Sequence, residues 1–231
     1  MPDINTEPAA NNQYDAHRLI FHMSIGGVSI CALGLLVAVI GVYQDIGLNI
    51  INLRIDKLGD YLSSPLAYVY NIGLLFSGAS FTLAMFGLYL LRYNTMTHYL
   101  ALSGGCAGLG ISLLGIYPYN DPIPHKLAAI FFIASTLIMF LLLVFTRRRY
   151  PWLCNFPLFI VSLLGVCFSI ALFVQMDSNS LDYRECTAGA FCYPAFSLWI
   201  HTLLTMLAGV GLAITAKNLL DQAIQAQNAK C

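Results

Sequence analysis

The chain has 231 residues, of which 58% are hydrophobic and only 10% are charged, and its formal net charge is zero. Ordinary soluble domains carry about 25% charged residues, so this composition excludes an ordinary soluble globular class. A balanced charge provides no basic field that would attract nucleic acid, and we expect no nucleic-acid partner. The composition is typical of a protein that lies in a membrane.

Six stretches of the chain contain no Asp, Glu, Lys or Arg, and each has 20 or more residues: 19–44, 61–91, 93–120, 127–146, 150–176 and 186–216. About 20 apolar residues in a helix cross a hydrocarbon core of about 30 Å. The sequence therefore predicts an all-α bundle of six transmembrane helices. The expected spans are about 19–43, 66–91, 99–118, 124–146, 153–175 and 195–216.

The two tails differ in character. Residues 1–18 are polar and rich in Asn, Pro and acids, which is typical of disorder. They lack the basic start and short apolar core of a secretory signal peptide. Residues 217–231 follow the last span with good helix formers, so we expect a helical tail there. The single domain is the bundle, 19–216.

Basic residues predict the orientation. With the N-terminus inside, seven of them fall on the inner side and four on the outer side. Cytoplasmic loops are enriched in Lys and Arg, so both termini should be cytoplasmic. Arg147, Arg148 and Arg149, directly after the fourth span, are the strongest determinant. The same triplet could instead bind anionic lipid headgroups at the inner face, at about 1 kcal/mol per basic residue.

Small residues mark the third span, where Gly104 and Gly108, and likewise Ser103 and Ala107, are four residues apart. Close contact between helices in lipid depends on small residues that let backbones approach. This pattern predicts a tightly packed third span in a central position.

Two outer connectors are long enough to have structure of their own. In 44–65 the apolar residues fit one face of a helix and also fit a strand, and both alternatives remain open. The connector 176–194 contains Cys186 and Cys192, which could form a disulfide if the loop faces an oxidising compartment. We expect the two connectors to form a cap on the outer end of the bundle.

Polar residues gather at the expected outer ends of the spans: Asn71, Asp121, His125, His201 and Asp60. Polar groups in lipid are costly unless they face inward, so these residues are candidates for a pocket that opens to the outer leaflet. Two interpretations stay open. Asp121, His125 and His201 could bind zinc and activate water for lipid ester hydrolysis. Alternatively, Asp121 caps the fourth span and the histidines form hydrogen bonds within the bundle.

Two stretches carry a family resemblance. One is 56–78, with DKLGD, SPLA, YNIGL and SG, and the other is 115–129, with GIYPYND before His125. Both resemble the bacterial membrane family of domain of unknown function 998. The resemblance implies six spans, a bacterial inner membrane location, and similarity to eukaryotic proteins of glycosylphosphatidylinositol lipid remodelling and autophagy modulation.

The leading functional hypothesis is a protein that binds, senses or remodels membrane lipid through the outer pocket. Catalytic and non-catalytic versions both remain open, and a metal-dependent membrane hydrolase is one alternative. A small-solute transporter or channel is another. Transporters coupled to protons or sodium use acidic residues at mid-membrane depth, and no predicted span contains an interior Asp or Glu.

Overall fold

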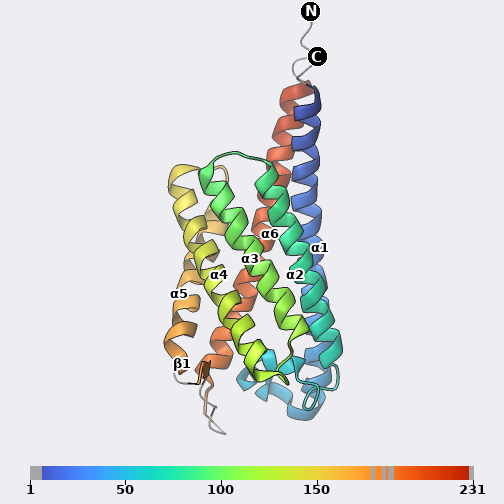
Figure 1. Ribbon diagram of the computed structural model, residues 1–231, viewed down its shortest axis with the longest axis vertical. Helices are drawn as coiled ribbons and strands as arrows, with labels where there is room; N and C mark the ends of the chain where they lie inside the picture. Colours follow the sequence, from blue (N-terminus) through green and yellow to red (C-terminus); the bar gives the residue numbers. More distant parts are fainter. Residues whose placement is uncertain (1–6, 178–179, 184–185, 187–189, 229–231) are drawn as a thin grey trace, which may run out of the picture.

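The computed structural model describes residues 7–177, 180–183, 186 and 190–228. It contains six helices that are long and apolar enough to cross a membrane, within these described ranges. They are α1 (Glu7–Ile46), α2 (Ala67–Leu90), α3 (Thr95–Ile116), α4 (Pro122–Arg149), α5 (Phe156–Gln175) and α6 (Tyr193–Asn228) (Figure 1). The predicted all-α six-helix bundle is confirmed.

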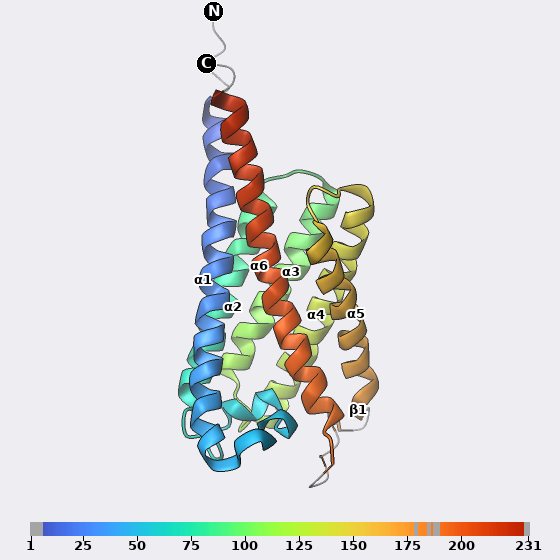
Figure 2. The same ribbon diagram turned by 180° about the vertical axis from the view of Figure 1, so that it is seen from behind.

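The helices form a closed ring in chain order. Each helix packs against the next, and α6 packs against α1 to close the ring. The start of α1 and the end of α6 extend beyond the other helices at one end of the molecule, which we call the terminal end (Figures 1 and 2). The connectors after α1 and after α5 lie at the opposite end, which we call the loop end.

The tail before the first span is helical from Glu7, so the predicted disorder is wrong for 7–18, and 1–6 lie outside the described residues. The physical reason is that this segment has surface to bury. Ala16 and His17 are buried, and the His17 Nε2 atom lies 2.6 Å from the Tyr93 hydroxyl. At the other terminus α6 continues to Asn228 and forms the expected helical tail, while 229–231 lie outside the described residues.

In the connector 44–65 the helical alternative is confirmed in part and the strand is wrong: residues 44–46 end α1, and two short 3-10 helices follow. Gly47, with φ +58°, ends α1 and starts the 3-10 helix η1 (Gly47–Asn52), and η2 (Ile55–Gly59) follows. In a 3-10 helix residues three apart lie on one face, which places Ile55 and Leu58 together under the connector. Both are buried. The connector after α5 begins with a small antiparallel hairpin of β1 (Met176–Asp177) and β2 (Asp182–Tyr183).

The third helix packs closely, as predicted, but it is not central. It lies in the ring between α2 and α4. Its small residues let it approach α2: a Cβ atom added at Gly108 would lie 2.8 Å from the Thr82 amide nitrogen and 2.9 Å from the Gly78 carbonyl oxygen. Small residues at four-residue spacing predict that two helices pack closely. They do not predict which helix is innermost.

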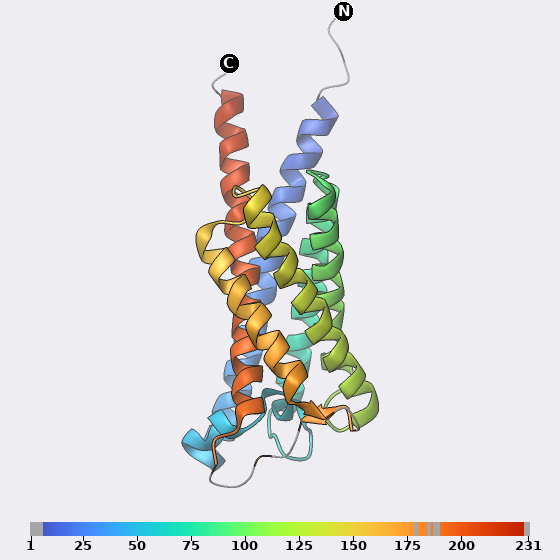
Figure 3. The same cartoon turned by 90° about the vertical axis from the view of Figure 1, so that its left-hand side faces the viewer.

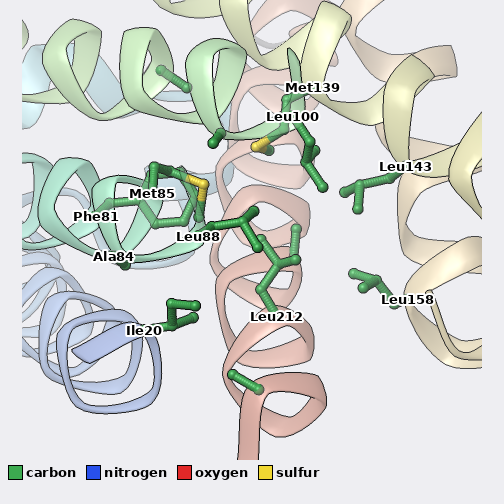
Figure 4. Packing of buried hydrophobic residues seen from close by; sticks show 14 of the residues in the cluster. Ile20, Phe81, Ala84, Met85, Leu88, Leu100, Met139, Leu143, Leu158 and Leu212 are labelled. Atoms are coloured by element: carbon green, nitrogen blue, oxygen red, sulfur yellow. The ribbon is translucent and has the colours of Figure 1, made fainter. Parts of the chain in front are cut away.

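A continuous hydrophobic core fills the ring in the half nearer the terminal end. All six helices contribute buried side chains to it, among them Ile20, Met85, Leu100, Met139, Leu158 and Leu212 (Figure 4). Protein interiors of this kind are close-packed. The half of the ring nearer the loop end is packed differently and contains the cavity described below.

Replacing Gly108 with Ala should destabilise the bundle by about 1–3 kcal/mol, because the added methyl group would meet backbone atoms of α2 that cannot move aside. Gly105→Ala is the matched control on the same helix, since its Cβ would lie 3.9 Å from Met85 Cβ, an ordinary contact. Thermal unfolding of both variants in detergent measures the effect. Equal melting temperatures for the two variants would contradict the close approach of α2 and α3.

Candidate functional site

A narrow cavity extends from the loop end inward through the ring. Its lining comes from α1, α2, α3, α4, α6 and the two loop-end connectors. The volume of the cavity is ≈ 100 Å³. On α2 its lining extends from Tyr70 to Phe81, which is about 16 Å at 1.5 Å per residue. The cavity is therefore about as deep as one leaflet of a hydrocarbon core, about 15 Å.

The cavity changes from polar to apolar with depth. Its deeper walls are mainly apolar side chains, among them Val28, Leu74, Phe81, Ile111 and Phe132. The loop end is lined by ionisable side chains instead: Arg54, Asp56, His125, Lys126, Asp182 and Tyr183. A ligand that fits both ends would have a polar part and an apolar part.

We call Arg54, Asp56, Lys126 and Asp182 the charged mouth. The Arg54 guanidinium forms two contacts with the Asp56 carboxylate, Nη2–Oδ2 at 2.5 Å and Nε–Oδ1 at 3.2 Å. Its Nη1 donates to Asp182 Oδ1 at 2.8 Å. Lys126 Nζ lies 3.2 Å from the other Asp182 oxygen. Two positive and two negative side chains are thus paired, and their charges sum to zero.

Aromatic rings complete the surroundings of Arg54, which is only 9% exposed. Its guanidinium carbon lies 5.5 Å from the ring centroid of Tyr119 and 5.1 Å from that of Tyr183. Cations at such distances are attracted by the faces of aromatic rings. The ring contacts and the two carboxylates together hold the arginine in place.

The environment keeps the charged mouth ionised. Burial alone would raise the pKa of Asp56, but the interaction with His125 and the charge and hydrogen bonds of Arg54 outweigh it and lower that pKa to about 2. For Asp182, the Arg54 contacts likewise overcome burial and lower the pKa. The pKa of Arg54 is raised because the two carboxylates outweigh its burial.

Two polar atoms at the mouth form no hydrogen bond within the described residues. His125 Nδ1 donates to the Tyr117 carbonyl oxygen at 2.9 Å. His125 Nε2 lies 3.6 Å from Asp56 Oδ2, and it has no hydrogen-bond partner among the described residues. The buried Tyr183 hydroxyl also lacks one within the described part of the chain. Burial raises the pKa of Tyr183, so its hydroxyl keeps a proton to donate.

His125 is the one of the five predicted pocket residues that lines this cavity. Asn71 is buried, and its Nδ2 donates to the Gly59 carbonyl oxygen at 3.0 Å, which attaches η2 to α2. Asp60 accepts hydrogen bonds from Asn120 Nδ2 at 2.6 Å and Ser63 Oγ at 2.7 Å. These bonds, against the opposing effect of burial, lower the pKa of Asp60. Both residues hold the loop end together.

The predicted zinc ligands Asp121, His125 and His201 do not converge. Asp121 is exposed at the start of α4, and its side chain makes no capping hydrogen bond. His201 is buried, with Nε2 3.1 Å from Thr136 Oγ1. Thr136 is about 16 Å further along α4 than His125. In the described ranges no group of three or more His, Cys, Asp or Glu residues could hold a metal.

Hydrogen bonds within the bundle account for His201, as the second interpretation predicted. Its Nε2 also lies 3.1 Å from Ser169 Oγ, and its ring packs edge-on against Phe132 and Phe140. Thr136 and Ser169 use their own protons on backbone carbonyls of α4 and α5, so the imidazole Nε2 must be the donor. His201 therefore joins α4, α5 and α6.

The loop-end connectors form a cap. Cys186 and Cys192 are joined by a disulfide, with their Cα atoms 5.4 Å apart. The Cys192 amide donates to Asn52 Oδ1 at 3.1 Å, and Trp199 Nε1 donates to the Leu53 carbonyl oxygen at 2.9 Å. With the Arg54–Asp182 pair, these contacts join the connector after α1 to the connector after α5 and to α6.

At the terminal end the three arginines of the triplet 147–149 have different surroundings. Arg147 Nη1 donates to the carbonyl oxygens of Pro151 at 3.2 Å and Cys154 at 3.1 Å. Arg148 and Arg149 are exposed. The first arginine therefore fixes the turn between α4 and α5, and the other two face the surroundings.

Sequence reasoning did not find the charged mouth. Arg54 and Asp182 are 128 residues apart, so their pairing exists only in the folded ring. One local signal was present: Arg54 and Asp56 flank Ile55 within an otherwise largely apolar connector. Charges in such a setting are candidates for buried pairs, because a buried charge requires a partner.

Acid should destabilise the protein through Asp56. Its pKa is depressed in the folded state, so its stabilising effect is complete above the ordinary value of 3.8 and is lost as pH falls through about 2. The size is about 2 kcal/mol. Asp56→Asn should flatten the loss of stability between pH 5 and pH 2, measured by thermal unfolding in detergent. The exposed Asp121→Asn control should keep it, and equal slopes for the two variants would contradict the assignment.

Comparisons with protein-family models, curated proteins and solved structures found no match. The resemblance noted above therefore rests on the sequence motifs alone, and function has to be argued from the cavity.

Proposed function

We propose that this integral membrane protein binds a membrane lipid in the cavity, with the polar part of the lipid at the charged mouth and an acyl chain along the apolar walls. The observation that carries the proposal is the change from ionisable to apolar lining along one continuous space. Ligand sites typically combine apolar walls with a few placed polar groups. Here the charged side chains are all at one end, and the deeper polar lining consists of uncharged side chains such as Ser24, Ser77 and Thr205, which suits an amphipathic molecule.

The charged mouth favours an uncharged, oxygen-rich group of the lipid. Its four charges are already paired, so a phosphate would have to compete with Asp56 and Asp182 for Arg54. Breaking a buried ion pair is costly. The Tyr183 hydroxyl is the donor at the mouth that has no partner among the described residues. A carbonyl or hydroxyl oxygen, such as those of the glycerol ester region, can accept a hydrogen bond from Tyr183.

The arrangement of His125 favours binding over hydrolysis. A histidine that acts as general base turns one ring nitrogen to its orienting partner and the other to the reacting group. In this site Nδ1 is on the Tyr117 carbonyl oxygen and Nε2 is near Asp56, so both nitrogens are directed at protein groups. We therefore favour a lipid-binding or lipid-sensing protein over a membrane hydrolase.

Packing disfavours a channel or transporter. A second, smaller space near the terminal end has a volume of ≈ 20 Å³ and is lined by His17, Met85 and Leu212, among others. Its described lining residues include none of those that line the main cavity. The hydrophobic core contributes side chains between the two. A solute path across the bundle would require this core to open.

Lipid retention tests the proposal. Ala129 lines the cavity, so Ala129→Phe should fill part of it and abolish co-purification of lipid in a mild detergent. Leu127→Phe is the control on the same helix, because Leu127 is 58% exposed and lines none of the described cavities. Native mass spectrometry counts the lipid, and thermal unfolding checks the fold. Equal lipid retention by both folded variants would overturn the proposal.

We propose further that the loop end faces outward, with both termini in the cytoplasm of a bacterium. Support comes from the exposed Arg148 and Arg149 at the terminal end, where they would also meet anionic headgroups of the inner leaflet.

Labelling of intact cells tests this orientation. A membrane-impermeant maleimide should react with Asp121→Cys at the loop end and leave Arg148→Cys unlabelled until the cells are opened. The unsubstituted protein measures the background from its own cysteines. Labelling of Arg148→Cys from outside would reverse the orientation.

A further inference from the structure

A groove separate from the cavity lies between α1 and α6. Its volume is ≈ 500 Å³, and its lining is apolar except for Thr202 and the Trp199 ring nitrogen. Ala32, Leu35, Leu36 and Val39 line it from α1, Ile55 from η2, and Trp199, Ile200, Thr202, Leu203 and Met206 from α6. The helical residues belong to the charge-free runs 19–44 and 186–216, so the groove faces hydrocarbon when the bundle is in a membrane.

The groove exists because the two helices cross. They diverge toward the loop end in Figure 2 and toward the terminal end in Figure 3, two views a quarter turn apart. Close approach occurs at Gly209, where an added Cβ would lie 3.1 Å from Val28 Cγ2. The groove residues are all on the loop-end side of this contact. There the helices separate, and Ile55 of η2 lies against both.

Only a thin wall divides this groove from the cavity. Ile55, Thr202 and Met206 line both spaces. Methionine is unbranched and adapts its shape readily. Thr202 and Met206 are half-buried. At these positions single residues therefore face both spaces.

We propose that the gap between α1 and α6 is a lateral portal, through which an acyl chain of a lipid in the loop-end leaflet passes from the bilayer into the cavity. This inference rests on the proposed function and names the route and the ligand class: a bilayer lipid with at least one acyl chain. The groove is apolar, lies at membrane depth and shares its wall with the cavity, and an acyl chain is the group that matches all three properties.

Trp199 marks the limit of the portal on the side of the loop end. Its ring lines the groove, and its Nε1 donates to the Leu53 carbonyl oxygen in the cap. Indole rings prefer the boundary between headgroups and hydrocarbon. The polar part of the lipid would then enter near the level of Trp199 and Ile55, beside the charged mouth. The acyl chain would enter on the side of Trp199 that is nearer the membrane centre.

The test compares two tryptophan substitutions on neighbouring residues of α1. Ala32 lines the groove but not the cavity, so Ala32→Trp should plug the portal. Leu33 is 61% exposed and lines neither space, so Leu33→Trp adds the same ring elsewhere. Leu203→Trp, from the opposite wall of the groove, is a second plug in case Ala32→Trp fails to fold.

Each protein is reconstituted in phosphatidylcholine vesicles and mixed with vesicles that carry phosphatidylcholine with a photoreactive acyl chain. After brief illumination, mass spectrometry measures cross-links to peptides that contain Phe81 or Leu114, which line the cavity. We expect the unsubstituted protein and Leu33→Trp to be labelled at equal rates, and both plugs to be labelled several-fold more slowly.

The outcomes separate the portal from the proposed function. Equal labelling of the plugs and the control would overturn the portal while lipid binding in the cavity stands. Absence of cavity labelling in the unsubstituted protein would overturn both. Slow labelling of the plugs with normal melting temperatures supports the portal.

Discussion

The loop end depends on the ion pairs of the buried Arg54 guanidinium. The guanidinium pairs with Asp56 in its own connector and with Asp182 in the hairpin after α5, which joins the two connectors, and two tyrosine rings lie beside it. Removing a charge from water is expensive, and a pair of this kind is tolerated only with good geometry and additional hydrogen bonds. Asp182 gains such a bond from Lys126. The result is a rigid mouth above the cavity.

The ring divides into two halves with different packing. Large apolar side chains of all six helices fill the half nearer the terminal end. In the half nearer the loop end the helices enclose a cavity, and α1 and α6 separate from each other. Glycines keep α2 and α3 in close contact, whereas α1 and α6 cross near Gly209 and leave a groove on the loop-end side of that crossing. The proposed lipid site and its proposed entrance follow from this division.

The fold could be predicted from the sequence because gaps between charges correspond directly to helix lengths in a membrane. The close contact of α2 and α3 was also predictable, since Gly108 and its neighbours carry a local signal. The site was only partly predictable. His125 was found because a histidine near a span end is conspicuous, whereas Asn71, Asp60 and His201 are equally conspicuous but bond within the protein. Arg54 and Asp182 meet only after the ring closes.

The central claim is that the cavity holds a lipid with its polar part at the mouth. The most direct measurement is an experimental structure of the protein in a nanodisc that retains native lipid. The account predicts density for one lipid, with an oxygen within hydrogen-bond distance of the Tyr183 hydroxyl and a chain that reaches toward Phe81 and Gly209. A cavity filled by a chain of ordered water, continuous with the space near His17 and Tyr93, would contradict it and support a solute path.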